Sequence, residues 1–398
     1  MELAMTRRHD LDWVRVCAFG LLVLYHVGMY YVSWDWHVKS PAAGPAIEPL
    51  MFLTAPWRLS LLFLVSGAAS AFLLAKMPKG FLGSRSWRLL LPLIFGMLVI
   101  VPPQAYYELL DSRFPGGYHD GYLAFWARYL SADGTFCDDD GCLRLPTWNH
   151  LWFVAYLWVY TVTLWLLLRL PSALVERARH RLGSLLSGPG LLLWPALLLI
   201  LARVVLVARF ESTHGLVDDW YNHAQYLPLF LLGFVMAGSD PIWRRMQKSR
   251  WIALSLAAVS YAFIAWYFAT FDDANPAPDA VRMLQRVAWG LNQWVSIVAI
   301  LGFAHRLAPG DSPALRYLTQ AIFPVYILHQ TVIVVAAHNL KPFAIAPLPE
   351  GLFLVALTFA ACFGGYEIIR RVGWLRPLFG LKRRTPARKL GDAVQPAS

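Results

Sequence analysis

The fold of this chain is decided by the stretch DWVRVCAFGLLVLYHVGMYYVS, residues Asp12–Ser33. Its length and apolar character match a helix of roughly 20 residues that crosses the hydrocarbon core of a bilayer. Arg15 and His26 interrupt the apolar run. At about 100° per residue they fall on one helix face, about 16 Å apart along the axis. The stretch therefore predicts a transmembrane helix with a cation near one end and an imidazole past its midpoint.

The rest of the chain repeats this apolar pattern. Of its 398 residues, 58% are hydrophobic and 15% are charged, whereas soluble domains carry about 25% charged residues. We expect an all-α, polytopic integral membrane protein, with one transmembrane domain over 1–381 and a basic, disordered cytoplasmic tail over 382–398. Hydropathy predicts about ten spans, near 14–33, 57–75, 89–107, 150–169, 190–208, 224–238, 252–271, 285–304, 318–338 and 351–369.

The net charge of +11 is unevenly distributed along the chain. Most Lys and Arg residues fall in alternate loops, as the positive-inside rule requires of cytoplasmic segments. With an even number of spans, both termini are then cytoplasmic. This distribution explains the basic charge without a nucleic-acid partner, and none is expected.

Two of the four cysteines flank a polar loop. Cys137 and Cys142 enclose Asp138-Asp139-Asp140-Gly141, in a segment that the same rule places outside the cytoplasm. A short disulfide fits an oxidising compartment. Zinc binding is disfavoured because no second ligand pair lies nearby, and no metal is expected.

The predicted outer loops are rich in aromatic and acidic residues. The first of them contains Trp34, Asp35, Trp36 and His37. One interpretation is an aromatic belt at the membrane interface. The other is a carbohydrate-binding platform, in which aromatic faces cover sugar C–H groups while carboxylate and imidazole groups bind hydroxyls.

His26 is the leading candidate for chemistry, because an ionisable group inside a span is costly to bury. A neutral imidazole can take a proton from a hydroxyl at neutral pH. The alternative is a structural histidine that is hydrogen-bonded to a neighbouring helix. His150 and His329 are predicted towards the outer side of two other spans and could line the same cavity.

Three arginines lie near the predicted cytoplasmic ends of two spans. Arg15, with Asp12 one turn away, could bind an anionic group or serve only as an interfacial anchor. Arg85 and Arg88 lie one helical turn apart and would suit a phosphorylated donor, or simply follow the positive-inside rule. Nucleophile-elbow, metalloprotease, P-loop and dinucleotide motifs are absent in a usable context.

Several motifs, in order, resemble one known family, the family-3 membrane acyltransferases. The motifs are Arg15 and His26 with ten residues between them, L-F-L-V-S-G (Leu62–Gly67), N-H-L-W-F (Asn149–Phe153) and F-P-V-Y-I-L-H (Phe323–His329). More narrowly, W-H-V-K-S (Trp36–Ser40), Y-L-P-L-F-L-L-G (Tyr226–Gly233) and Y-E-I-I-R-R (Tyr366–Arg371) resemble the glucan biosynthesis protein C branch.

The resemblance implies a multi-pass enzyme of the bacterial inner membrane. It would transfer an acyl group, succinyl or acetyl, from cytoplasmic acyl-CoA to hydroxyls of a periplasmic glucan or other glycan. His26 and Arg15 would then be catalytic. Arg85 and Arg88, with Arg15, would bind the donor, and Trp34, Asp35, Trp36, His37, His150 and His329 would bind the acceptor.

Two other functions fit the sequence. In a transporter of glycan or acyl groups, the polar residues would line a path and no bond would change. In a non-catalytic partner of glucan-synthesis proteins, loss of His26 would have no effect on acylation.

Overall fold

A computed structural model describes residues 7–111, 117–138, 141–307 and 310–383, and these are mainly helical. The helices are α1 (His9–Met29), α2 (Glu48–Thr54), α3 (Arg58–Lys76), α4 (Phe81–Phe95), α5 (Pro102–Leu110), α6 (Tyr122–Leu130), α7 (Trp152–Leu167), α8 (Ser172–Leu186), α9 (Gly190–Leu206), α10 (Trp220–Met236), α11 (Asp240–Thr270), α12 (Asp279–Leu307), α13 (Pro313–Leu340), α14 (Pro347–Arg371) and α15 (Leu375–Leu378). A π-helical turn, Gly96–Ile100, joins α4 to α5. The predicted all-α class is confirmed, while most of the predicted tail, 384–398, lies outside the described residues.

Short segments complete the chain between these helices. Single 3-10 turns lie at Pro45–Ile47, Asn149–Leu151 and Lys341–Phe343. Strands β1 (Cys137–Asp138) and β2 (Gly141–Cys142) pair antiparallel, with Cys137 opposite Cys142. These two cysteines form a disulfide, which confirms the bond that the sequence left open.

Each of the ten predicted spans coincides with a helix. Among the described residues, eight helical segments are long and apolar enough to cross a bilayer, and the bent pair α8–α9 makes a ninth. The remaining helix, α10, has 17 residues, which is short of the roughly 20 that the hydrocarbon core needs. The multi-pass architecture is therefore confirmed, and α10 explains why the count falls below ten.

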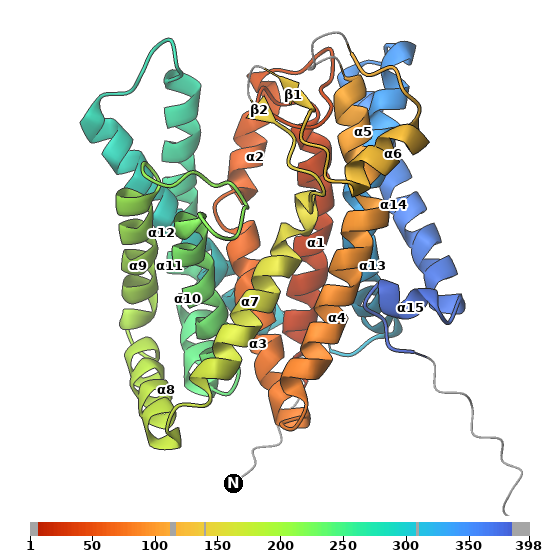
Figure 1. Cartoon of the computed structure of the whole chain (residues 1–398). Helices are drawn as coiled ribbons and strands as arrows, with labels where there is room; N and C mark the ends of the chain where they lie inside the picture. Colours follow the sequence, from red (N-terminus) through yellow and green to blue (C-terminus); the bar gives the residue numbers. More distant parts are fainter. Residues whose placement is uncertain (1–6, 112–116, 139–140, 308–309, 384–398) are drawn as a thin grey trace, which may run out of the picture.

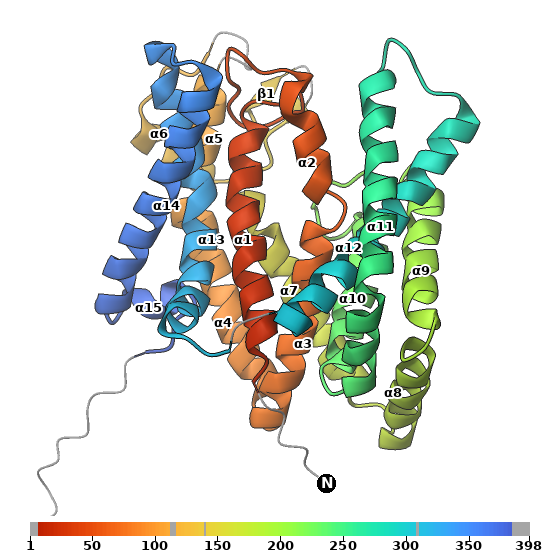
Figure 2. The same ribbon diagram turned by 180° about the vertical axis from the view of Figure 1, so that it is seen from behind.

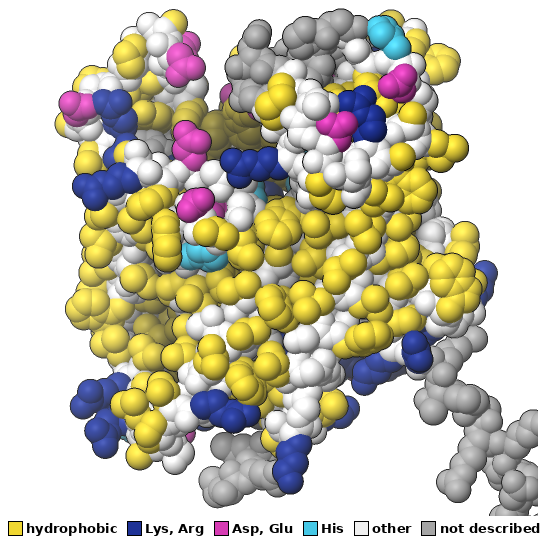
Figure 3. All heavy atoms as spheres, in the orientation of Figure 1, with side chains coloured by type: hydrophobic (Ala, Val, Ile, Leu, Met, Phe, Trp, Pro, Cys, Tyr) yellow, Lys and Arg dark blue, Asp and Glu magenta, His cyan; other side chains and the backbone are white. Residues whose placement is uncertain are grey.

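The helices pack side by side, with α1 near the middle of the bundle (Figures 1 and 2). α1 contacts α3, α12 and α13, and α13 in turn packs against α14. On the other side, α9, α11 and α12 pack together, and α10 lies against α3. The space-filling view shows a hollow in the upper part of the molecule, between the α9–α12 group and the helices on the other side (Figure 3). The position of α1 places its polar residues inside the bundle.

The crossing of α3 and α10 depends on two glycines. A β-carbon on Gly67 would lie 1.8 Å from the carbonyl oxygen of Phe230, and one on Gly233 would lie 1.9 Å from that of Leu64. No side chain fits at such distances, so the two backbones are in direct contact, as is common where small residues meet between membrane helices. The glycines belong to the motifs Leu62–Gly67 and Tyr226–Gly233, which therefore have a packing role.

The two ends of the bundle carry different elements. The start of α1 lies at the same end as α8 and α15, whereas α2, α5, α6 and the β1–β2 hairpin lie at the opposite end (Figure 1). This agrees with the predicted even number of crossings between the start of α1 and α15, in which the short α10 counts as one crossing. That the α8 end faces the cytoplasm stays a prediction from the distribution of Lys and Arg.

Candidate functional site

Two histidines from distant parts of the sequence form a hydrogen-bonded pair inside the bundle. Nδ1 of His26 on α1 lies 2.7 Å from Nε2 of His329 on α13. Their rings are stacked, with centroids 4.9 Å apart and planes 4° apart. His329 is fully buried, but His26 keeps an exposed part. His26 is therefore the more exposed member of the pair.

The backbone of α13 determines which ring nitrogens carry protons. Nδ1 of His329 lies 2.6 Å from the carbonyl oxygen of Tyr326, which can only accept a hydrogen bond. His329 Nδ1 therefore donates, and in a neutral ring its Nε2 is left as an acceptor. The His26 Nδ1–H must then donate to that Nε2. It follows that Nε2 of neutral His26 carries a free lone pair and can accept a proton.

A third histidine packs against this pair. The ring of His150 is perpendicular to that of His329, with centroids 5.1 Å apart. His150 Nε2 donates to the carbonyl oxygen of Ile327 at 3.1 Å, and Tyr326 Oη donates to the His150 carbonyl oxygen at 2.5 Å. Asn149, the preceding residue, has a positive φ of 39°, a conformation that asparagine tolerates better than most residues. The Asn149-His150 pair of the N-H-L-W-F motif thus fixes the direction of the buried His150 ring.

A chain of hydrogen bonds links His150 to the outer end of the bundle. Gln104 Nε2 donates to His150 Nδ1 at 3.3 Å, and Gln104 Oε1 accepts from Gln330 Nε2 at 3.1 Å. Gln330 Nε2 also donates to His37 Nε2 at 2.9 Å. His37 Nδ1 donates to the Glu108 carboxylate at 2.5 Å. The outer loop after α1 is therefore connected to the histidine cluster by side chains alone.

A buried arginine is an electrostatic neighbour of His26. Arg58, at the start of α3, is 4% exposed and lies over the Tyr25 ring at 3.5 Å. Its Nη1 donates to Thr54 Oγ1 at 3.0 Å, while its buried Nε has no partner among the described residues. An anionic group near His26 would complete its interactions.

In the predicted acceptor loop, Trp34 to His37, the tryptophan side chains pack against the rest of the protein. Trp36 is 9% exposed and packs in a cluster with Tyr30, so its ring supports the loop from within. Trp34 lies against Phe52, with ring centroids 5.0 Å apart. Asp35 is exposed. Of the four predicted acceptor residues in this loop, Asp35 is therefore exposed, Trp34 and His37 are partly buried, and Trp36 is buried.

The three arginines predicted for the donor gather at the opposite end of α1. Arg15 interacts electrostatically with Arg88, and Arg85 interacts with both. Arg88 Nε donates to the Gly380 carbonyl oxygen at 3.1 Å, while the buried Arg85 Nε has no partner among the described residues. Like charges at close range are unfavourable. Such a cluster is suited to a polyanion.

The Asp12 carboxylate, near the start of α1, forms an ion pair with Arg7 and not with Arg15. Asp12 was expected to pair with Arg15 one turn away, but its carboxylate accepts from Arg7 Nε at 2.8 Å. Arg7 precedes the helix and folds back onto Asp12, while Asp12 stays an electrostatic neighbour of Arg15 without a direct contact. Arg15 is therefore left without that ion pair.

Sequence reasoning missed three residues of the site. Arg58, Gln104 and Gln330 each lie in or beside an apolar segment, and this was the only available signal. Gln330 directly follows the recognised His329. Their functional relevance comes from the contacts with residues far away in the sequence.

Comparison with known proteins adds evidence of relationship. A family model described as "Acyltransferase domain" matches residues 8–367. Glucans biosynthesis protein C of Escherichia coli O6:K15:H31 (strain 536 / UPEC) is 23% identical over 345 residues, which is 81% of each chain. The protein of the same name from Shigella dysenteriae serotype 1 (strain Sd197) is 23% identical over 349 residues, again 81% of each chain. No solved structure matches the chain.

Proposed function

This chain belongs to the acyltransferase family whose model spans residues 8–367, and on that premise we propose that it O-acylates a periplasmic glycan. It is a multi-pass membrane acyltransferase. The proposed donor is a cytoplasmic acyl-CoA, succinyl-CoA or acetyl-CoA. The proposed acceptor is a hydroxyl of a glucan or related glycan outside the inner membrane.

The observation that carries the proposal is the orientation of the His26–His329 pair. A general base needs an unprotonated nitrogen that a substrate can reach. The Tyr326 backbone carbonyl fixes the tautomer of His329, and His329 in turn fixes that of His26, so that Nε2 of neutral His26 carries no proton. His26 is also the partly exposed member of the pair.

The proposed reaction needs no net proton uptake or release. Nε2 of His26 takes the proton of the glycan hydroxyl, and the oxygen attacks the thioester carbonyl carbon. The carbon–sulfur bond then breaks, and the proton on His26 passes to the departing CoA sulfur. The products are the glycan ester and free CoA. His329 does not touch the substrates in this scheme and holds the His26 ring in the required tautomer.

The arginine cluster supports a phosphorylated donor. Arg15, Arg85 and Arg88 are electrostatic neighbours at the predicted cytoplasmic end of α1. CoA carries several phosphate charges, which would relieve the repulsion among these guanidinium groups. Arg15 lies three helical turns from His26 on the same helix face, so α1 would guide the donor from phosphate site to base.

The relatives support the glycan acceptor. Those reported above are named for glucan biosynthesis. In this chain the exposed Asp35 and the half-buried His37 lie in the outer loop that hydrogen bonds connect to the histidine cluster. A sugar bound at this loop would approach His26 from the outer end.

Mass spectrometry of periplasmic glycans tests the function directly. Glycans are compared between cells with the gene, cells without it, and cells that express the gene from a plasmid. The proposal predicts a mass increment per substituent that depends on the gene, with a value that identifies succinyl or acetyl. Movement of unmodified glycan with no such increment would instead indicate a transporter.

A further inference from the structure

α8 is an exposed helix at the predicted cytoplasmic end, and it bends sharply away from α9. The two helices meet at an angle of 107°. Along α8, only Leu186 is buried. The helix carries Arg177, Arg179 and Arg181 but only one carboxylate, Glu176. It is therefore a basic helix with exposed leucines beside the membrane-spanning bundle, which is typical of a helix in the membrane interface.

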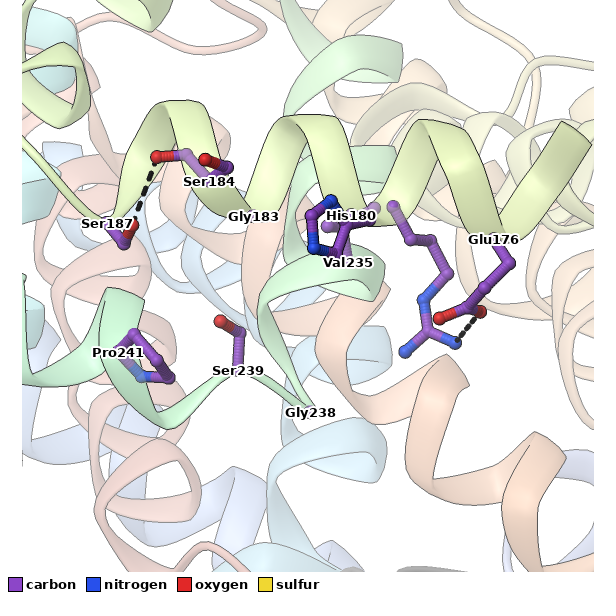
Figure 4. Close-up of a pocket in the computed structure, with 10 residues that line it drawn as sticks. Glu176, His180, Gly183, Ser184, Ser187, Val235, Gly238, Ser239 and Pro241 are labelled. Atoms are coloured by element: carbon purple, nitrogen blue, oxygen red, sulfur yellow. Dashed lines mark hydrogen bonds and ion pairs between the residues drawn. The ribbon is translucent and has the colours of Figure 1, made fainter. Parts of the chain in front are cut away.

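One face of α8 lines a polar pocket of about 400 Å³ with the turn between α10 and α11 (Figure 4). Glu176, Arg179, His180, Gly183, Ser184 and Ser187 contribute from the α8 side, and Gly238 and Ser239 from the facing turn. Arg179 reaches across, because its Nη2 lies 3.6 Å from the position that a β-carbon on Gly238 would occupy. The pocket is therefore lined by the cation of Arg179, the imidazole of His180 and the hydroxyls of Ser184, Ser187 and Ser239.

Two apolar grooves meet this pocket. One, of about 300 Å³, lies between α8, α9 and α10, and the other, of about 180 Å³, lies between α7, α8 and α10. Both grooves share Leu182, Leu231 and Val235, and Val235 also lines the polar pocket. Arg179 lines the polar pocket and the smaller groove. One polar pocket and two apolar grooves therefore converge at one point.

We propose that this composite site binds an anionic diacyl phospholipid of the phosphatidylglycerol type. Arg179 binds the phosphate, serine hydroxyls bind the glycerol headgroup, and each groove takes one acyl chain. The charge supports an anionic lipid, since α8 carries three arginines against one glutamate. Glu176 pairs with Arg179 at 3.5 Å, but its side chain is 74% exposed. It is free to turn towards water when a phosphate binds.

Native mass spectrometry of the full chain in detergent tests the site. The probes are dioleoyl phosphatidylglycerol and, with the same acyl chains, dioleoyl phosphatidylcholine. The wild type should retain one phosphatidylglycerol preferentially. Arg179→Gln should weaken this retention about tenfold, since a charged hydrogen bond contributes about that factor. Arg177→Gln is the matched control, because it removes the same charge from the same helix but does not line the pocket.

A second pair of variants blocks the pocket without removing charge. A β-carbon on Gly183 meets nothing within 4 Å, so Gly183→Leu should fold normally and fill part of the pocket that Gly183 lines. Gly364→Leu on the exposed face of α14 is equally unhindered and lies elsewhere. Gly183→Leu should lose the lipid, while Gly364→Leu should retain it.

Three outcomes would overturn the proposal. The first is equal retention of the two lipids, which would make the grooves non-selective. The second is an equal loss in Arg177→Gln and Arg179→Gln, which would indicate only diffuse charge. The third is displacement of the lipid by inorganic phosphate at similar concentration, which would show that the pocket takes a free anion and that the grooves contribute nothing.

Discussion

The tautomer of a single ring determines what this site can do. His26 has chemical use as a base only if its Nδ1 carries the proton, and His329 imposes this through a bond of 2.7 Å. The same arrangement, in which a second group orients a catalytic histidine, recurs in hydrolytic triads. Here the orienting group is another neutral histidine, itself held by a helix carbonyl.

Removing the orienting ring should therefore slow the chemistry without affecting donor binding. We expect His329→Ala to lower kcat by about 10²-fold or more, because general-base catalysis contributes about 10²–10⁴-fold, with little change in the KM for acyl-CoA. Steady-state kinetics of purified protein measures both. His338→Ala, on the same helix, is the control. An unchanged kcat in His329→Ala would assign His329 a packing role only.

A second prediction concerns donor binding by the cluster of Arg15, Arg85 and Arg88. Arg15→Ala should raise the apparent KM for acyl-CoA about tenfold, or about 1.4 kcal/mol, since it removes one charged contact to phosphate. Lys79→Ala removes an exposed cation at the same end of the molecule and should leave KM unchanged. If the two variants behave alike, Arg15 is an interfacial anchor and not a donor ligand.

At this scale the sequence predicted relations within one helix better than contacts between helices. Helical periodicity placed Arg15 and His26 on one face, since that relation lies within one helix. The bond between His26 and His329 joins positions 303 residues apart, and no local pattern encodes which spans become neighbours. Arg58 could not be distinguished from an ordinary interfacial arginine, because only its burial against the Tyr25 ring separates the two.

The helices themselves explain why some motifs are glycine-rich. Gly67 and Gly233 allow α3 and α10 to touch through their backbones. Gly67→Ala or Gly233→Ala should destabilise the protein by about 1–3 kcal/mol, the usual cost of overpacking, because the helices must separate to admit a methyl group. Thermal unfolding in detergent should show a lower Tm for either variant. Gly364→Ala, whose β-carbon meets nothing, should match the wild type, and equal Tm values for all three would refute close contact.

Hydropathy located the spans but not the elements between them. All ten apolar stretches lie on helices, because length and composition alone decide insertion in lipid. The 107° bend between α8 and α9 was not predicted, since a window that averages over about 19 residues does not detect a break of a few residues. The outer helices α5 and α6 were missed as separate elements for a similar reason: their stability comes from packing of aromatic residues such as Tyr106 and Phe125.

The whole molecule has to connect two compartments. The arginine cluster and the acceptor loop lie near opposite ends of α1, and His26 lies between them along the helix. One face of a single helix thus links the proposed donor site, the base and the proposed acceptor site. This arrangement can serve the proposed reaction only if the α8 end faces the cytoplasm, where the proposed donor is present.

Cysteine labelling tests that orientation. In a background without Cys17 and Cys362, Asp120→Cys places a thiol at the outer end and Arg177→Cys places one on α8. A membrane-impermeant maleimide added to spheroplasts should label the first variant, and should label the second only after lysis. The opposite pattern would invert the molecule and place the arginine cluster on the periplasmic side, where acyl-CoA is absent.

The central claim is that His26 Nε2 removes the proton from the acceptor hydroxyl. It is tested most directly by the acyl content of periplasmic glycans from cells that make equal amounts of membrane-inserted wild type, His26→Gln and, as a control, His338→Gln. We predict full substitution in the wild type and the control, and none above background in His26→Gln. Acylation at the wild-type level in His26→Gln would contradict the claim.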